Sequence, residues 1–170
     1  IHLFCADFVQ YWVHRSFHRF TSLWQFHKIH HSTEAMDWLA GSRLHVVDVV
    51  LTRGASYIPI VCLGFSPEAV QLYLPVVAIQ AVFVHSNTRF RFPRLKRFLT
   101  TPQVHHWHHS SEEAALDKNF AVSFSLIDRL FGTYYCPDEW PNKYGLYQEH
   151  ISDQFVKQLV YPFLKAVKRA

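Results

Sequence analysis

Two copies of one histidine pattern, HxxHH, constrain the fold of this chain more than any other feature of its sequence. The first copy is HKIHH, residues 27–31, and the second lies in TPQVHHWHHS, residues 101–110. Histidines three and four positions apart share one face of a helix, so each copy directs its imidazoles toward one point. Neutral imidazoles gathered in this way are typical of a transition-metal site, whereas protonated ones would repel each other. Helices that are distant in sequence are therefore expected to meet around metal.

Four groups of histidines supply the candidate metal ligands. HRSFH adds a pair four residues apart, and a single histidine stands in HSN, residues 85–87. The candidates are His14, His18, His27, His30, His31, His85, His105, His108 and His109. One tetrahedral zinc ion takes about four ligands, so nine histidines suit two ions. An all-imidazole set favours Fe, Zn or Cu.

The other histidines are assigned different roles. His106 departs from the HxxHH repeat and is predicted not to bind metal. His2 and His150 stand alone in the sequence and are interpreted as surface or packing residues. His45, in SRLHVVD, is left open between packing and a direct or supporting role at the metal site.

Two further residues are candidates for hydrogen bonds that orient the imidazoles. Asp7, Tyr11, His14 and His18 step by four, three and four along one helical face, and Asp7 is an acid within an apolar run. Orienting an imidazole N–H is a common role for such a carboxylate, with a helix-end acid at the membrane surface as the alternative. Asn87, which follows His85 in HSN, is the second candidate.

The hydrophobic pattern predicts an all-α chain with a membrane hairpin. Residues 1–20 are expected to be the end of a membrane helix, and residues 23–32 a second, short helix. Residues 68–87 hold one acid, at their start, and have the length of about 20 residues that a bilayer span needs. Residues 44–87 are therefore predicted to form a membrane hairpin, and residues 88–170 a cytosolic cap. The alternative is a pair of buried helices in a soluble protein.

A basic cluster directly follows the predicted hairpin. It consists of Arg89, Arg91, Arg94, Lys96 and Arg97. Basic residues beside a membrane span mark its cytoplasmic end, so the histidines are expected on the cytoplasmic side of a bacterial inner membrane or the endoplasmic reticulum.

Composition narrows the class of protein further. The chain has a net charge of +4 with histidine neutral, and its positive charges lie beside apolar stretches, which favours a membrane surface over nucleic acid. The three cysteines show no CxxC spacing, so they are expected to be reduced and not to form a zinc finger. The chain begins at Ile1 within an apolar run and is predicted to be truncated at its N-terminus.

These motifs resemble the fatty acid hydroxylase and sterol desaturase superfamily of membrane di-iron enzymes. The resemblance runs from about Asp7 to Tyr135, through DFVQYWVHRSFH, LWQFHKIHHS, HSN, TPQVHHWHHS and DKNFAVSFSLIDRLFGTYY. It implies a single domain over residues 1–170, an integral membrane protein whose histidine-rich cytosolic cap holds two irons. HRSFH matches the HxxxH motif of the family, and His85 matches the isolated histidine that follows the hairpin.

Three departures from the family pattern leave the subfamily open. Ile127 precedes Asp128 where a tryptophan is common, and NFA at residues 119–121 replaces an asparagine, tyrosine and glycine. RLHVVD also lacks the proline that usually follows its histidine. None of these departures touches a matched ligand.

The resemblance implies a di-iron centre that uses O2 to hydroxylate or desaturate a C–H bond of a sterol, fatty acyl or related apolar lipid. No flavin, haem or ferredoxin motif occurs in the chain, so a cytochrome b5-like or ferredoxin-like electron donor is expected. The basic cluster would either dock this donor or face lipid headgroups. Two alternatives are a zinc-dependent membrane metallohydrolase, against which the lack of HExxH counts, and a non-catalytic metal-binding membrane protein.

Overall fold

The computed structural model describes residues 1–167, and these residues form an all-helical fold. The longer helices are α1 (His2–Arg19), α2 (Thr21–His31), α3 (Val46–Cys62), α4 (Pro67–His85) and α7 (Phe155–Val167). The shorter elements are α5 (Pro102–His108), α6 (Ser125–Leu130) and the 3₁₀ helices η1 (Ala40–Ser42), η2 (Leu95–Arg97) and η3 (Glu113–Ala115). The predicted all-α class is confirmed, since residues 1–167 hold no strand beyond one isolated bridge between Ser110 and Tyr144.

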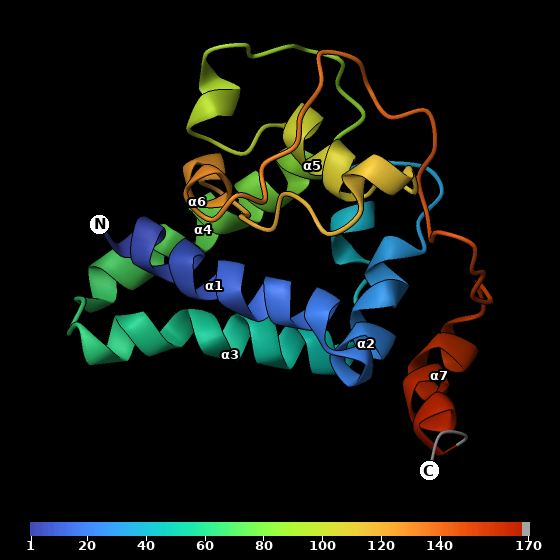
Figure 1. Cartoon of the computed structure of the whole chain (residues 1–170). Helices are drawn as coiled ribbons and strands as arrows, with labels where there is room; N and C mark the ends of the chain where they lie inside the picture. The colour runs from blue at the N-terminus through green and yellow to red at the C-terminus, as the bar shows by residue number, and fades with distance from the viewer. Residues whose placement is uncertain (168–170) are drawn as a thin grey trace.

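Three long helices, α1, α3 and α4, form the body of the molecule, and most of the shorter elements lie along the side of α1 opposite to α3 (Figure 1). An apolar cluster of Ala6, Ile60, Tyr73 and Val77 joins these three helices away from the histidines. Residues 63–66 reverse the chain between α3 and α4, where Gly64 takes a φ of 64° that glycine adopts without strain. The helices α3 and α4 thus form a helical hairpin.

The hairpin leaves much apolar surface exposed. Among the described residues, α4 is the one helix that is long and apolar enough to cross a membrane, and 17% of that stretch is buried. The outer face of α3 exposes Val50, Ile58 and Val61 in the same way. Helices in the core of a soluble protein would be mostly buried, and these two helices are not buried within the described residues, while the membrane hairpin stays a prediction.

Two buried carboxylates hold the loop before α6. Asp7 accepts the backbone N–H groups of residues 122–124 at 2.7–3.1 Å. Asp128 accepts the backbone N–H groups of residues 120–121 at 2.7 and 3.0 Å, and the hydroxyl of Thr133 at 2.8 Å. A buried N–H without a partner is costly, so the two acids tie this loop to α1 and α6.

These contacts correct the role predicted for Asp7. Its side chain shares the helical face of His14 and His18, but the loop at residues 122–124 covers it and supplies three backbone donors. The carboxylate therefore orients backbone and not an imidazole. Its effect on the histidines is indirect, because the same loop places the carbonyl of Phe120 against His14.

Asp7→Ala should lower the free energy of unfolding by at least about 2 kcal/mol, because it leaves three buried N–H groups without an acceptor. Denaturant unfolding of the full-length protein in detergent, followed by circular dichroism, would measure the loss. Asp153→Ala is the control, since Asp153 is exposed and pairs with Arg43 at the surface. Equal stability of the two variants would contradict the proposed role of Asp7 in holding the loop at residues 122–124.

Candidate metal centre

All nine predicted ligands lie together at the end of the helical body. They come from four helices: His14 and His18 from α1, His27, His30 and His31 from α2, His85 from the end of α4, and His105, His108 and His109 from α5 and its last turn. All but His18 are buried, and His18 is partly buried. The tight turn at Phe20 folds α2 back against α1, which brings the first two motifs together.

The nine histidines divide into two groups of potential ligands. The five-histidine group contains His14, His18, His27, His31 and His108, and the four-histidine group contains His30, His85, His105 and His109. Within each group, one nitrogen of every residue lies within 4.8 Å of the others. Each HxxHH motif contributes to both groups, so the two groups share the helices α2 and α5. This division fits two metal ions better than one.

Lone pairs face each other inside the five-histidine group. Nδ1 of His14 lies 2.7 Å from the carbonyl of Phe120, and Nδ1 of His27 lies 2.7 Å from the carboxylate of Asp48. Both oxygens are acceptors, so each Nδ1 carries the proton and each Nε2 is a bare acceptor. These two Nε2 atoms are 2.9 Å apart, too close for two lone pairs without a cation between them. The donor set therefore fits a metal ion.

The four-histidine group repeats this arrangement. His30 and His85 donate from Nδ1 to backbone carbonyls, at 3.3 and 2.7 Å. Their Nε2 atoms are 3.3 Å apart, and Nε2 of His105 lies 2.9 Å from that of His85. Nε2 of His109 is 3.2 Å from that of His105. In this group too, the converging atoms are Nε2 nitrogens.

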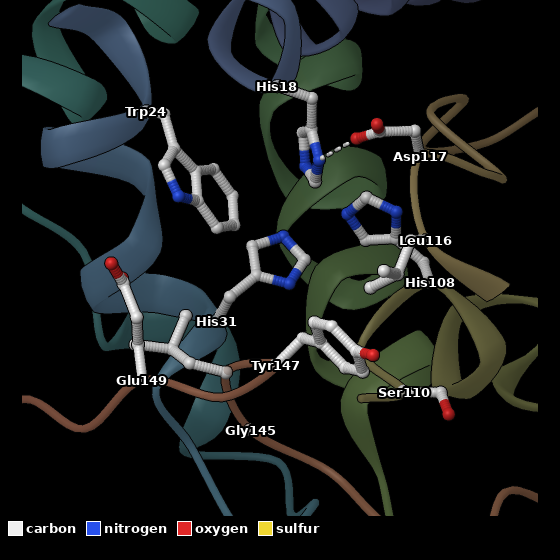
Figure 2. Close-up of a pocket in the computed structure, with 11 residues that line it drawn as sticks. His18, Trp24, His31, His108, Ser110, Leu116, Asp117, Gly145, Tyr147 and Glu149 are labelled. Carbon is white, nitrogen blue, oxygen red and sulfur yellow. Dashed lines mark hydrogen bonds and ion pairs between the residues drawn. The ribbon is translucent and has the colours of Figure 1, made fainter. Parts of the chain in front are cut away.

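Unpaired nitrogens give a second sign of a missing ligand partner. Nε2 of His18 and Nε2 of His108 are buried without a hydrogen bond. Their Nδ1 atoms do have acceptors, namely Asp117 at 3.2 Å and the carbonyl of Lys118 at 2.7 Å. Figure 2 shows both rings, with His31, gathered around one space. Buried polar atoms are rarely left unpaired, so these nitrogens too fit a metal ion.

Burial keeps these imidazoles in the form that binds metal. Loss of solvation lowers the pKa values well below 6.5, and the neighbouring imidazoles lower them further, for His27, His30, His31, His105, His108 and His109. The rings are therefore neutral at pH 7, as coordination requires.

Asp48 is a functional candidate that sequence reasoning missed. It is 1% exposed and accepts the Nδ1 proton of His27, which is the role expected of Asp7. In the sequence it is an acid that interrupts the apolar run of α3, which marks it as unusual. No spacing rule connects it to His27, because the two meet only when α3 packs beside α2.

Two other proposed supporting residues have different surroundings from those expected. His45 caps α3 by accepting the N–H of Val47, and its Nε2 lies 3.0 Å from the carbonyl of Leu159. Neither of its nitrogens contacts a candidate ligand, so His45 packs α7 onto the body. Asn87 is exposed, beyond the end of α4, and has no recorded contact with a candidate ligand.

The remaining histidines have packing roles. His106 lies outside both groups, with Nε2 3.0 Å from the carbonyl of Ser86 and Nδ1 2.9 Å from the hydroxyl of Tyr144. His2 stacks between two aromatic rings, and His150 is exposed.

Two cavities reach the histidines from different sides. A cavity of about 270 Å³ is lined by His18, His31 and His108, together with polar residues of the cap such as Asp117 (Figure 2). A smaller cavity of about 100 Å³ opens between α1, α3 and α4 and is lined by members of both groups, His14 and His30 among them. The centre is thus accessible from the cap and from the hairpin.

Comparison with known proteins places this site in a family. The profile of the family described as fatty acid hydroxylase matches residues 1–133. The matched range includes all nine histidines of the two groups. The chain belongs to the fatty acid hydroxylase family, and the resemblance inferred from its motifs is confirmed.

Curated relatives include three lipid-oxidising enzymes by name. The chain is 31% identical to ornithine lipid hydroxylase OlsE of Rhizobium tropici, over 95% of this chain and 49% of the relative. It is 29% identical to human alkylglycerol monooxygenase, over 79% and 30% of the two chains, and 28% identical to mouse lathosterol oxidase, over 83% and 46%. The chain therefore spans about half the length of these relatives or less. No solved structure matches the chain significantly.

Gly41→Ala should disturb the four-histidine group. A Cβ atom at Gly41 would lie 2.9 Å from Nδ1 of His85, whose ring is fixed by its bond to the carbonyl of Ala81. The ring must therefore move, and we expect the affinity of this group for a metal ion to fall at least about tenfold, in line with other changes next to metal ligands. Elemental analysis of the purified full-length protein would measure it.

Gly54→Ala is the matched control for this substitution. Gly54 lies in α3, and a Cβ atom there meets nothing within 4 Å. Its metal content should equal that of the parent protein. If Gly41→Ala also keeps its full metal content, then His85 is not held as a ligand in the position described.

Proposed function

We propose that this chain is the histidine-rich part of a membrane-bound, O2-dependent di-iron oxidoreductase that hydroxylates or desaturates a C–H bond of a lipid. The observation that carries the proposal is the pair of histidine groups with converging Nε2 atoms, among which the facing pairs His14/His27 and His30/His85 have their protons on Nδ1. The names of the relatives, which are lipid hydroxylases, monooxygenases and a sterol oxidase, support the reaction class.

Each histidine group would hold one iron, and the bound irons would supply the activation of O2 and the removal of hydrogen from the C–H bond. The chain's own groups prepare the ligands for this task. Asp48 fixes the tautomer of His27, and backbone carbonyls fix those of His14, His30, His85 and His108. The Nε2 atoms are thereby oriented before the metal binds, which reduces the reorganisation that binding requires.

The proposed membrane placement rests on the hairpin and on the residues beside it. With α4 spanning the bilayer and α3 as the second arm, the histidines lie at the shared end of these helices. The basic cluster begins four residues after His85 and favours the cytoplasmic side for this end. Two of its members also hold the cap, because Arg89 stacks over Trp140 and Lys96 pairs with Asp138 at 3.0 Å.

The two cavities suggest separate routes for the reactants. The cavity between α1, α3 and α4 would admit part of a lipid molecule from the bilayer. The cavity on the cap side carries Asp117 and Ser110, which can hydrogen-bond water and pass protons to and from solvent. Electrons would come from a cytochrome b5-like or ferredoxin-like partner, docking at the exposed arginines of the basic cluster, Arg91, Arg94 and Arg97.

The reaction itself provides the test. The full-length protein, loaded with Fe²⁺ and placed in lipid nanodiscs, should convert ornithine lipid, an alkylglycerol or lathosterol in the presence of ¹⁸O2 and a reductant. Mass spectrometry would detect one added ¹⁸O atom on hydroxylation or the loss of two hydrogens on desaturation.

Two neighbouring histidines give matched variants for this assay. His108→Gln should lower turnover at least about 100-fold, because it removes a proposed ligand. His106→Gln should keep most activity, since a glutamine amide can donate to the carbonyl of Ser86 and accept from Tyr144 as the imidazole does. Zinc-dependent hydrolysis without O2 consumption would support the metallohydrolase instead, and bound metal without any turnover would support a non-catalytic protein.

A further inference from the structure

The cavity between α1, α3 and α4 contains a charged side chain that the proposed metal sites do not use. Arg53 lines this cavity together with Gln10, Thr52 and several candidate ligands. It lies seven residues after the first residue of α3, hence about 10 Å along the helix from the histidine end. Arg53 is itself exposed at the rim of this cavity, and most of its neighbours along the outer face of α3, such as Val50 and Ile58, are apolar and exposed.

The polar side chains of Gln10, Thr52 and Ser56 next to Arg53 form hydrogen bonds, whereas among the described residues Arg53 forms no hydrogen bond or ion pair. The amide of Gln10 donates to Ser56, and the hydroxyls of Thr52 and Ser56 donate to backbone carbonyls of α3 at 2.8 Å. Within the described part of the chain, no carboxylate forms an ion pair with Arg53. Asp48, which lines the same cavity, accepts the Nδ1 proton of His27 through one carboxylate oxygen at 2.7 Å, whereas its other oxygen is buried without a hydrogen bond.

The direction of α3 favours an Arg53 side chain that extends toward the end of the helix near the histidines. Cα–Cβ bonds in a helix tilt toward its N-terminus, and the N-terminus of α3 is the end near the histidines. A charged residue within a membrane segment is expensive to insert and marks a functional position. A guanidinium is also the side chain best suited to bind a carboxylate or a phosphate through two parallel hydrogen bonds.

We propose that Arg53 binds the anionic head group, carboxylate or phosphate, of the lipid substrate and thereby sets which carbon is oxidised. This inference rests on the proposed function and adds a substrate class to it. The cavity of about 100 Å³ is smaller than the roughly 300–1,000 Å³ that encloses a drug-sized ligand, so it admits only the head group and adjoining carbons. The carbon presented to the histidines is then one close to the charged group, with the rest of the chain in the bilayer.

A binding experiment with matched lipids tests the role of Arg53. The probes are oleate with its uncharged analogue methyl oleate, and oleoyl lysophosphatidate with monooleoylglycerol. Each competes with tritiated oleate for the iron-loaded, full-length protein in detergent without O2, so that no turnover occurs. The parent protein should bind the charged member of at least one pair about tenfold or more tightly than the neutral member, and the pair with the larger ratio identifies carboxylate or phosphate.

Three variants separate the specific contact from general effects of charge and folding. Arg53→Gln should bring the ratio close to one, and Arg53→Lys should keep part of it, because the charge remains without the two parallel hydrogen bonds. Arg97→Gln, in the exposed basic cluster, should leave the ratio unchanged. Iron content equal to that of the parent shows that each variant is folded around its histidines.

Two results would overturn the inference. One is equal affinity for charged and neutral probes in the parent protein, and the other is an unchanged ratio in Arg53→Gln. If either result is found together with normal O2-dependent turnover, the role of Arg53 is contradicted and the proposed function is not. A ratio that depends on Arg53 in a protein with no turnover on any lipid would leave the anion site intact and contradict the proposed function.

Discussion

The structure depends on a repulsion that only a cation relieves: bare Nε2 lone pairs of buried imidazoles pointing at one another. Hydrogen bonds from Nδ1 to fixed acceptors prevent the rings from turning away, as with His14 against the carbonyl of Phe120 and His27 against Asp48. Burial makes protonation unfavourable, so a proton is a poor substitute for a metal ion. Metal binding and the folding of this region are therefore expected to be coupled.

The rest of the fold serves to keep this arrangement rigid. The loop that carries the acceptor for His14 is itself tied down by Asp7 and Asp128, so the support extends two layers outward from the histidines. Burial raises the pKa of Asp128 to about 6, and its bonds to backbone N–H groups and to Thr133 counter this rise. The hairpin of α3 and α4 contributes one ligand and one supporting acid, and it leaves an opening toward the side on which apolar surface is exposed.

The sequence predicts well which histidines converge, because their spacing follows helix geometry, and their role as metal ligands stays a prediction. An HxxHH motif on a helix brings three imidazoles to one end, and the two copies supply six of the nine histidines that converge, with His106 outside both groups. The other three come from the HxxxH pair, His14 and His18, and from the isolated His85. The supporting residues were not predictable in this way. Asp7 and Asp48 are both single acids in apolar helices, and only the packing of α3 and of the loop at residues 122–124 decides which one meets an imidazole. How the nine ligands divide between two groups also depends on how α2 faces α5, which no local pattern specifies.

The stoichiometry and partition of bound iron test the central claim most directly. Elemental analysis and Mössbauer spectroscopy of the full-length protein, reconstituted anaerobically with Fe²⁺, should find two irons per chain in nitrogen-rich environments. His31→Ala changes the five-histidine group, and His109→Ala changes the four-histidine group. Each substitution should weaken the binding of a different iron. One iron per chain in the parent protein, or loss of the same iron in both variants, would contradict a centre built from two histidine groups.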